Sequence, residues 1–290
     1  MVRVAVIGHT GRLGRPLMRI LKEHPKVAVV YAANSRESRG DLSQADCVFL
    51  ALPALPPGQS RAFVVKHQAL LKGQKIIDLS ADFRLEWVYG LPEINRKAIA
   101  GATKVANPGC YATSVLLGLG PLIGKLAPTL ICLDATSAIS GAGLKKRKKD
   151  NFLSYKVGHV HEHLPEIKMV SGAADIIFNP LRCDNTDFGL VSYIKVHGLT
   201  KEEGIVEQYR RFYSNEPWIR IVGHDMQTAD VIGTNYCDIK MQWECRNTLL
   251  IISALDNTLK GGASQAIQNF NLMFGFNESM GLKRYSKNRP

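Results

Sequence analysis

One cysteine of this sequence stands where a nucleophile could operate, in the segment Asn107-Pro108-Gly109-Cys110-Tyr111. The proline and glycine favour a sharp turn, and the apolar run Val115 to Leu119 that follows is typical of a buried helix. A thiol at a helix start has a pKa below its usual value of about 8.5, because the helix dipole and the first N–H groups stabilise thiolate. An isolated cysteine is more often a small buried hydrophobe. The turn and helix around Cys110 favour instead a nucleophile for a carbonyl or an acyl phosphate.

Histidines at alternate positions form a second group that can do chemistry. His159, His161 and His163 lie within the segment 157–167 and are three of the eight histidines of the chain. In an extended strand such residues share one face, which suits a loop at an active site. The same spacing suits zinc, but only Glu162 and Glu166 stand near as further ligands. We favour a general acid–base for the thiol and predict no metal, with zinc and plain surface histidines as the alternatives.

A glycine-rich turn near the N-terminus follows an expected strand and opens an expected helix. Its spacing, Gly-x-x-Gly-x-x-Gly over residues 8–14, is a variant of the dinucleotide-binding fingerprint. Glycine permits a tight turn and lets the backbone approach a pyrophosphate, whose charge is stabilised at the helix N-terminus. The residues expected to contact the cofactor in this turn are Gly8, Thr10, Gly11, Arg12, Leu13 and Gly14.

The end of the next expected strand bears on the choice of cofactor. NAD enzymes usually carry an acidic residue there for the ribose hydroxyl, whereas residues 31–36 of this chain contain no acid. Ser35 and Arg36 suit the 2′-phosphate of NADP(H), because a dianion needs several donors. We therefore predict NADP(H), with Ser35 and Arg36 as ligands and Arg39 as an alternative ligand. The other interpretation is that Arg36 is a solvated loop charge.

Elements that position these groups follow from the hydrophobic pattern. In the first part of the chain, strands alternate with helices, which predicts a parallel sheet with both faces covered. After Cys110, longer strands with fewer helices predict an antiparallel or mixed sheet. The expected strands are 2–7, 27–31, 46–52, 75–79, 129–139, 188–196, 236–242 and 248–255, and the expected helices are 16–24, 60–71, 111–119 and 263–274.

The predicted fold class is therefore α/β, with two domains. Residues 1–109, with a returning C-terminal segment 258–290, form a Rossmann-type parallel-sheet dinucleotide domain. Residues 110–257 form an α+β catalytic and dimerisation domain. The chain of 290 residues is long enough for two such cores.

Composition limits the cellular compartment and the partners that we expect for this protein. The six cysteines form no Cys-x-x-Cys pair, no signal-peptide layout opens the chain, and no apolar run is long enough for a membrane span. We therefore expect a cytoplasmic protein with no membrane partner. The net charge of +12 attracts anions in general, from nucleic acid to phosphorylated metabolites.

A run of five cations, Lys145 to Lys149, contributes to this charge. It is typical of an exposed loop, and it also suits an electrostatic funnel for an anionic substrate. Nucleic-acid binding is the least favoured reading, because the run lacks interleaved aromatic residues and the chain has no known nucleic-acid motif.

Several longer blocks resemble one enzyme family. They stand in family order along nearly the whole chain: residues 78–84 (Asp-Leu-Ser-Ala-Asp-Phe-Arg), 89–96, 107–113, 140–143, 161–167, 233–237 and 256–275. Together they are similar to the N-acetyl-γ-glutamyl-phosphate reductases, relatives of the aspartate-semialdehyde and glyceraldehyde-3-phosphate dehydrogenases. The resemblance implies reduction of an acyl phosphate to a semialdehyde with NADPH, through a cysteine thioester, as a step of arginine biosynthesis.

The resemblance also assigns roles to individual residues. It implies that Cys110 is the nucleophile and His161 the acid–base group. It implies that the small acyl-phosphate substrate contacts Arg84, Asn107, His163, Ser140, Gly141 and Gly143. Asn257 would lie near the nicotinamide, and the enzyme would be a homo-oligomer, a dimer or a tetramer.

This chain departs from the family pattern in three places. The segments 31–47 and 84–89 are shorter than usual, so a strand and a helix of the cofactor domain are expected to be missing, and His9 and Arg12-Leu13 are unusual in the glycine turn. Two other functions stay open. One is reduction of a carrier-bound aminoadipyl phosphate in lysine biosynthesis. The other is a non-catalytic basic binding protein, which the retention of Cys110, His161 and Lys260 argues against.

Overall fold

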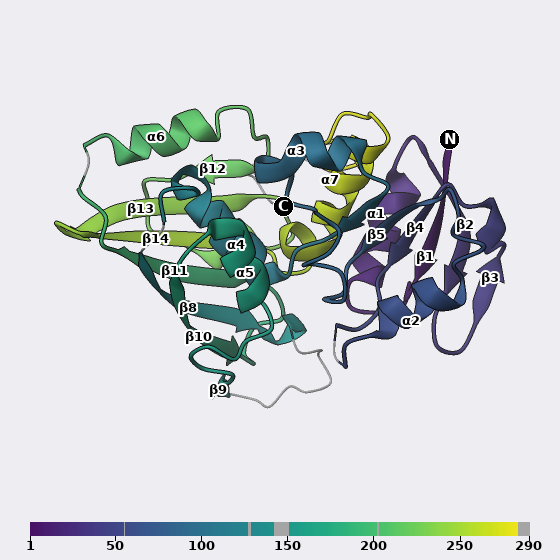
Figure 1. The fold of residues 1–290 in the computed structure, drawn as a ribbon, viewed down its shortest axis with the longest axis horizontal. Helices are drawn as coiled ribbons and strands as arrows, with labels where there is room; N and C mark the ends of the chain where they lie inside the picture. Colours follow the sequence, from purple (N-terminus) through teal and green to yellow (C-terminus); the bar gives the residue numbers. More distant parts are fainter. Residues whose placement is uncertain (55, 127–128, 142–150, 202, 284–290) are drawn as a thin grey trace. The chain divides into compact units, whose positions relative to one another are not determined.

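The computed structural model describes residues 1–54, 56–126, 129–141, 151–201 and 203–283 (Figure 1). The chain divides into two compact units, one made of Met1–Gly109 and Gly262–Pro290, the other of Cys110–Gly261. Each unit contains one seven-stranded sheet.

The sheet of the first unit is parallel except at one edge, as expected for a dinucleotide-binding domain. Its strand order is β3-β2-β1-β4-β5-β7-β6. β4 is buried along its whole length, which is typical of a parallel sheet covered on both faces. The strands are β1 (Val2–Ile7), β2 (Val27–Ala33), β3 (Ser38–Gly40), β4 (Cys47–Leu50), β5 (Lys75–Asp78), β6 (Val88–Tyr89) and β7 (Lys104–Ala106).

The α-helices of this unit, within the part of the chain that the structure describes, are α1 (Gly14–Glu23), α2 (Gln59–Lys66), α3 (Pro92–Gly101) and α7 (Ser264–Met273). α7 comes from the end of the chain and packs against α1, α3 and β5. Its Phe270 ring lies 5.7 Å from that of Phe49 on β4. α7 therefore belongs to the first unit, while α3 was not predicted and α2 ends five residues earlier than expected.

The shortened segment after β2 is a hairpin. β3 pairs antiparallel with β2, and a short 3₁₀ helix, η1 (Leu42–Gln44), leads on to β4. Gly40 permits the close pairing, because its φ is +86° and a Cβ there would lie 1.9 Å from the carbonyl oxygen of Val30. All residues between Ala33 and Cys47 are described. None of them is in an α-helix, and the segment still contains one strand, β3.

The second unit contains a mixed sheet of order β12-β13-β14-β11-β8-β10-β9. β10 pairs parallel with β8 and β12 parallel with β13, while the remaining pairs are antiparallel. The predicted mixed sheet is confirmed. Its strands are β8 (Leu130–Ala138), β9 (Phe152–Ser154), β10 (Asp175–Cys183), β11 (Leu190–His197), β12 (Ile219–Ile221), β13 (Cys237–Cys245) and β14 (Thr248–Leu255).

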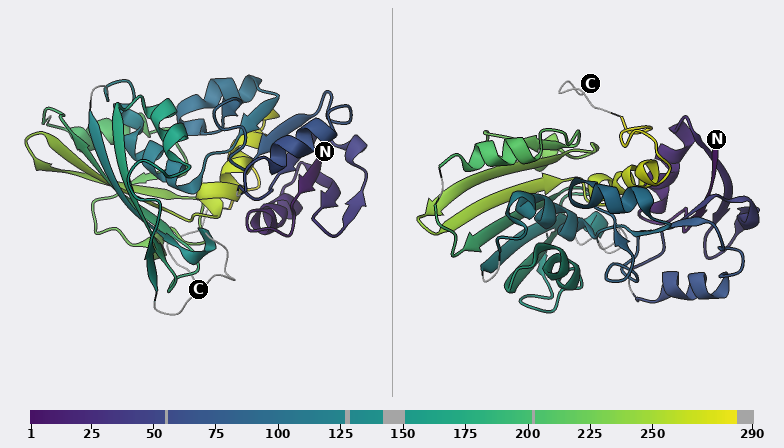
Figure 2. Two further views of the ribbon diagram at one scale, coloured as in Figure 1. Left: turned by 60° about the horizontal axis from the view of Figure 1, so that its bottom comes forward. Right: turned by 45° about the horizontal axis from the view of Figure 1, so that its top comes forward.

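One face of this sheet is covered by helices, as Figure 2 shows. α4 (Cys110–Leu119) packs on β11, β13 and β14, α5 (Leu164–Ser171) packs on β10 and α4, and α6 (Ile205–Phe212) packs on β12. Only α4 was predicted. Within the described residues no helix combines the length and apolar character needed to cross a membrane.

Candidate active site

Cys110 is the first residue of α4, at the position expected of an activated thiol. The other nine residues of the helix are buried, whereas Cys110 is half-buried. Gly261 packs directly against it, since a Cβ at Gly261 would lie 2.8 Å from the Cβ of Cys110. Gly261 therefore belongs to the surroundings of the thiol, a role that the sequence analysis missed.

We predict that Gly261→Ala displaces the Cys110 thiol and lowers turnover without unfolding the protein. The added methyl group meets the Cβ of Cys110 and cannot be accommodated unless α4 shifts. Turnover should fall roughly tenfold to a hundredfold, since misplacement of a reacting group by about 1 Å has effects of that size. Gly101→Ala is the matched control, because a Cβ at Gly101 meets nothing within 4 Å. Equal turnover in the two variants would contradict the close packing.

A cluster of rings connects the start of α4 with the histidine segment. The ring of Tyr111 lies 5.5 Å from that of His161 and 5.8 Å from that of His163. The two histidine rings are 4.9 Å apart. Tyr155 completes the cluster, with its hydroxyl 3.2 Å from that of Tyr111 and its ring 5.8 Å from His161. Two of the three predicted histidines thus lie beside the residue that follows Cys110.

The histidine segment is an irregular loop that ends at α5, so the interpretation as an extended strand is wrong. His163 is the N-cap residue of α5, and its backbone N–H donates to Nδ1 of His161 at 3.1 Å. The His161 ring is buried. His159 points elsewhere: it is exposed, and its Nδ1 lies 3.6 Å from an Asp175 carboxylate oxygen.

Burial keeps the two tyrosines of the cluster neutral. It raises the pKa of Tyr155 to about 12, with a smaller contribution from the nearby charge of Cys110. Burial also raises the pKa of Tyr111, to which the hydroxyl of Tyr155 and the charge of Cys110 add. Both phenols therefore remain hydrogen-bond donors at neutral pH. Tyr155 was missed because it lies outside every block that resembles the family.

Ser140 and Asn257, far apart in sequence, are joined by hydrogen bonds. The Asn257 side-chain amide donates to Ser140 Oγ at 2.8 Å, and its oxygen accepts from the backbone N–H of Gly189 at 3.0 Å. Gly141 lies next to this pair, because a Cβ there would be 3.9 Å from Asn257 Nδ2. The predicted site residue Gly143 and the run Lys145 to Lys149 lie outside the described residues.

In the first unit, the glycine turn has the features that a dinucleotide requires. Gly8 has φ +85°, and a Cβ there would lie 2.4 Å from the carbonyl oxygen of Ala51, which follows β4. A Cβ on Gly14 would lie 2.0 Å from the carbonyl oxygen of Gly8. The turn lies between the carboxyl ends of β1 and β4, where the strand order reverses and such sheets bind ligands. The first turn of α1 carries no acidic residue, so its N-terminus suits a pyrophosphate.

The other residues of the predicted turn surround this position. Leu13 packs on Gly262, whose Cβ would lie 2.6 Å from a methyl carbon of Leu13. The backbone N–H of Gly8 donates to the carbonyl of Ala33 at 2.7 Å, which brings the β2–β3 turn next to the glycine turn. The remaining predicted contacts, Thr10, Gly11 and Arg12, lie within the same loop.

Ser35 and Arg36 are exposed in the β2–β3 turn. Asn34 holds the turn, because its side-chain oxygen accepts from the backbone N–H groups of Arg36 and Glu37. Glu37 is an acid that the sequence analysis did not weigh. Its carboxylate pairs with Arg39 at 3.0 Å, and that hydrogen bond is the main reason why the pKa of Glu37 is lowered. Arg39 is thereby engaged with Glu37, which favours Arg36 as the phosphate ligand.

Arg84 and Asn107, two predicted substrate ligands, are both buried near the carboxyl end of β5. The backbone N–H of Asn107 donates to the carbonyl of Asp78 at 2.7 Å. Burial raises the pKa of the Asp78 carboxyl, while hydrogen bonds from the side chain and backbone of Ser80 and the charge of Arg84 oppose that rise. The side chain of Asn107 is held by Asn269 at 3.1 Å and by the carbonyl of Gly262 at 3.2 Å.

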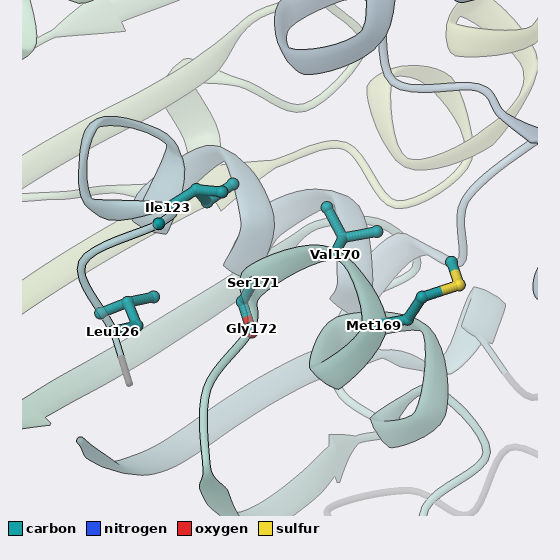
Figure 3. A pocket seen from close by; sticks show the side chains of 7 residues that line it. Ile123, Leu126, Met169, Val170, Ser171 and Gly172 are labelled. Atoms are coloured by element: carbon teal, nitrogen blue, oxygen red, sulfur yellow. The ribbon is translucent and has the colours of Figure 1, made fainter. Parts of the chain in front are cut away.

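Two hollows lie on the surface of the second unit, and Cys110 is not among the residues that line them. One, with a cavity volume of about 310 Å³, lies between α5 and the loop after α4 and is lined by apolar residues such as Ile123, Leu126 and Met169 (Figure 3). The other is lined by His161 and Glu162, together with Lys168 of α5. Among the described residues, no three histidine, cysteine or acidic side chains are grouped to hold a metal ion.

Comparison with known proteins agrees with this arrangement. The family model of the semialdehyde dehydrogenase NAD-binding domain matches residues 3–44 and 40–102, and that of the semialdehyde dehydrogenase dimerisation domain matches residues 110–257. Solved structures share the fold. An aspartate semialdehyde dehydrogenase II from Vibrio cholerae has a TM-score of 0.75 at 18% identity, over 95% of this chain and 98% of that one. One from Candida albicans, solved with NADP, has a TM-score of 0.71 at 15% identity, over 94% of this chain and 99% of that one.

Curated relatives are closer in sequence. The N-acetyl-gamma-glutamyl-phosphate reductase of Geobacter metallireducens is 36% identical over 98% of both chains, and that of Desulforudis audaxviator is 36% identical over 97% of this chain and 98% of its own. The first alignment spans 347 positions, more than the 290 residues of this chain, in agreement with its shortened segments. With its NAD(P)-binding domain, its half-buried thiol at a helix start and similarity along nearly its whole length, this chain belongs to the N-acetyl-gamma-glutamyl-phosphate reductase family of oxidoreductases.

Proposed function

We propose that this protein reduces N-acetyl-γ-glutamyl phosphate to N-acetylglutamate 5-semialdehyde and phosphate, through a thioester on Cys110. The observation that carries the proposal is the position of Cys110 at the start of α4, one residue before Tyr111, whose ring contacts His161 and His163. A thiolate stabilised at a helix start, with imidazoles close by, is the combination that attack on an acyl phosphate requires.

In the first half-reaction the Cys110 sulfur forms a bond to the acyl carbon, and the bond from that carbon to the phosphate oxygen breaks. Backbone N–H groups at the start of α4 stabilise the negative charge on the carbonyl oxygen. In the second half-reaction the thioester carbon accepts a hydride, and His161 protonates the resulting oxyanion. His161 then takes the proton back as the carbon–sulfur bond breaks, which releases the aldehyde and restores the thiolate.

Bound NADPH supplies the hydride. The glycine turn from Gly8 to Gly14 fits the pyrophosphate of such a cofactor, because its glycines allow a tight turn, in which Cβ atoms would meet backbone carbonyl oxygens, directly before α1. Ser35 and Arg36, in the adjacent β2–β3 turn, are the residues we assign to the 2′-phosphate. We assign Asn257 to the nicotinamide, and Ser140 and Gly141 to the substrate.

The reverse reaction tests this proposal. Purified protein with N-acetylglutamate semialdehyde should reduce NADP⁺ only when inorganic phosphate is present, since phosphate must release the acyl group from Cys110. Aspartate semialdehyde, glyceraldehyde 3-phosphate and a carrier-linked aminoadipate semialdehyde are the competing substrates. Faster turnover of the carrier-linked substrate would assign the protein to the lysine-type reaction instead, and no phosphate-dependent turnover of any of them would overturn the proposal.

Cofactor choice gives a second prediction. Arg36→Ala should weaken NADP⁺ binding roughly tenfold and leave NAD⁺ binding nearly unchanged, since only the 2′-phosphate gains charge-assisted hydrogen bonds from this side chain. Calorimetric titration measures both affinities, and Arg39→Ala is the comparison because Arg39 is paired with Glu37. The Arg36 effect should shrink at high salt, because the turn is exposed. Equal affinity of the parent protein for the two cofactors would exclude this assignment.

Self-association and compartment complete the proposal. One face of the second unit's sheet carries exposed or half-buried residues at alternate positions, including Leu130, Tyr193 and Ile177. We assign this face to a dimer contact, in keeping with the match to a dimerisation domain. Light scattering should then give about twice the chain mass of 32.0 kDa. None of the six cysteines forms a disulfide bond, which suits a reducing compartment such as the cytoplasm.

A further inference from the structure

His161 is surrounded by groups that can affect its protonation. Its ring packs against the rings of Tyr111, Tyr155, His163 and Phe178. Several titratable or charged side chains lie on the elements around the ring. They are Cys110 and Tyr111 of α4, Tyr155 and Lys156 after β9, His159, Glu162 and His163 of the loop, Glu166 and Lys168 of α5, and Asp175, Arg182 and Cys183 of β10. Among these, Glu162 is the residue whose carboxylate oxygen lies 3.9 Å from Nδ1 of the ring.

Nδ1 of His161 has two neighbours that require opposite protonation states. The backbone N–H of His163 donates to it, so Nδ1 holds a lone pair and the ring proton is on Nε2 in this conformation. An acid–base cycle at Nε2 requires the other arrangement. When Nε2 gives up its proton and recovers it, Nδ1 must carry a proton throughout, and that N–H needs an acceptor.

The carboxylate of Glu162 is such an acceptor, and a cation restrains it. Lys156 Nζ donates to Glu162 Oε2 at 2.5 Å, and the same oxygen is the one nearest His161 Nδ1. Lys156 has φ +47° and is the only non-glycine residue with positive φ in the described parts of the chain. Such a backbone conformation costs free energy, so neighbouring interactions must maintain it.

The surroundings of Glu162 determine the charge of its carboxyl group. Burial tends to raise the pKa of the Glu162 carboxyl, but the hydrogen bond from Lys156, a backbone hydrogen bond and nearby positive charge outweigh this, and the pKa is lowered. Glu162 is therefore ionised at neutral pH. Its side chain retains 28% exposure and lines the hollow beside His161, so the carboxylate has room to move toward the ring.

We infer that Glu162 is a positioning residue for His161: its carboxylate accepts the Nδ1 proton of the ring during turnover, and Lys156 controls how strongly that carboxylate acts. A nucleophile, a base and a third group that orients the base recur in thiol and hydroxyl enzymes. The inference rests on the acid–base role proposed for His161. It adds two residues, Glu162 and Lys156, that lie outside the roles assigned above.

Substitutions at Glu162 and at Lys156 should move the titration of the His161 ring in opposite directions. Glu162→Gln removes a negative charge that stabilises the imidazolium of His161, so the ring should titrate at lower pH. Lys156→Met removes the cation that neutralises Glu162, so the ring should titrate at higher pH. An opposite charge within 4–6 Å moves a titration by roughly 1 unit or more, and we expect shifts of about 0.5–1 pH unit because the pair is partly exposed. A purely structural role would not produce shifts of opposite sign.

The experiment is an NMR titration of the histidine ring signals in the full-length protein, with His161→Asn to assign the signal. Asp175→Asn is the matched control, because its carboxylate lies 3.6 Å from His159 Nδ1 and 3.4 Å from Lys168 Nζ. In that variant the His159 signal should respond and the His161 signal should not. The pH dependence of kcat is then measured for Glu162→Gln and Lys156→Met, and its limbs should move as the His161 signal does.

Opposite shifts of the His161 titration, followed by the kcat profile, support the inference. Shifts in one direction, or no shift in either variant, overturn it. The titration does not depend on turnover, so it remains readable if the proposed function fails. In that event His161→Asn would leave the reaction unaffected, whereas failure of the present inference alone would leave His161→Asn inactive with an unresponsive ring in the other two variants.

Discussion

Replacing Cys110 with serine should lower turnover to the background rate, a loss of roughly 10⁴-fold or more. A serine hydroxyl at a helix start, the position of Cys110, remains protonated at neutral pH, whereas a helix start stabilises the ionised form of a thiol. The oxygen is also a poorer leaving group when the intermediate collapses to aldehyde. The measurement is kcat for phosphate-dependent NADP⁺ reduction, and a Cys110→Ser variant that kept even a tenth of the parent rate would exclude the thioester mechanism.

The fold should survive this change. Cys110 is half-buried and its sulfur is replaced by a slightly smaller oxygen, so thermal unfolding should occur within a few degrees of the parent protein. Cys183→Ser is a useful comparison, since Cys183 is buried at the end of β10. That variant should be less stable than Cys110→Ser while retaining its activity per folded molecule.

Thiol labelling tests the reactivity of Cys110 independently of turnover, and the structure shows which cysteine competes with it for the reagent. Cys47, Cys183 and Cys237 are buried, and burial raises the pKa of Cys47 far above its usual value. Cys245 is exposed in the β13–β14 turn, and hydrogen bonding to Thr248 is the largest cause of its lowered pKa. The labelling experiment therefore needs a Cys245→Ser background, in which Cys110 should react fastest with iodoacetamide. Substrate should protect Cys110, whereas it should not protect Cys245 in the parent protein.

Local signals in the sequence predicted the parts of the site that depend on neighbouring residues. The start of α4 at Cys110 follows from a proline–glycine turn before an apolar run, and the glycine turn follows from its spacing after β1. Both are decided within about ten residues. For the same reason β14 was predicted with its observed bounds, as an apolar run that is buried over most of its length.

Parts of the site that depend on distant pairing could not be predicted. β10 contains Pro180, and a proline argues against a strand because it has no N–H to donate. Here β9 is short and pairs only with residues 181–183 of β10. The carbonyl of Pro180 accepts a hydrogen bond from the backbone N–H of Tyr155. The segment after β9 is positioned by that pairing. The approach of Tyr155 to Tyr111 and the ion pair of Lys156 with Glu162 therefore depend on sheet contacts for which the sequence gives no local sign.

Glu37 was missed for a different reason, because it stands in the sequence directly after Ser35 and Arg36, the residues assigned to the 2′-phosphate. Its importance depends on the hairpin, which brings the Asn34–Glu37 turn next to the glycine turn through the bonds from Gly8 and His9 to Ala33. In this chain the short antiparallel β3 follows β2 directly. In a shortened segment, the residues expected from the family pattern and the residues that meet in space need not coincide.

The two neighbouring histidines should differ sharply when each is replaced by asparagine. His161→Asn should reduce kcat by roughly 10²–10⁴-fold, because the oxyanion then lacks a group that can give a proton and take it back. His163→Asn should act mainly on KM, because His163 is assigned to a substrate contact and the change leaves the His161 ring and the backbone of residue 163 in place. His159→Asn should leave both constants close to the parent values, since His159 is exposed and faces Asp175.

Steady-state kinetics at saturating cofactor, with N-acetylglutamate semialdehyde and phosphate varied in turn, separates these effects. Asparagine keeps a hydrogen-bonding side chain of similar size, so a lost contact and a lost proton can be told apart. The ring of His161 is buried between Tyr111 and Phe178, whereas His163 is half-buried at the start of α5, which also favours His161 for a proton transfer shielded from water. A large loss of kcat in His163→Asn with a mild effect in His161→Asn would exchange the two roles, and equal, small effects in both would remove the histidine segment from the chemistry.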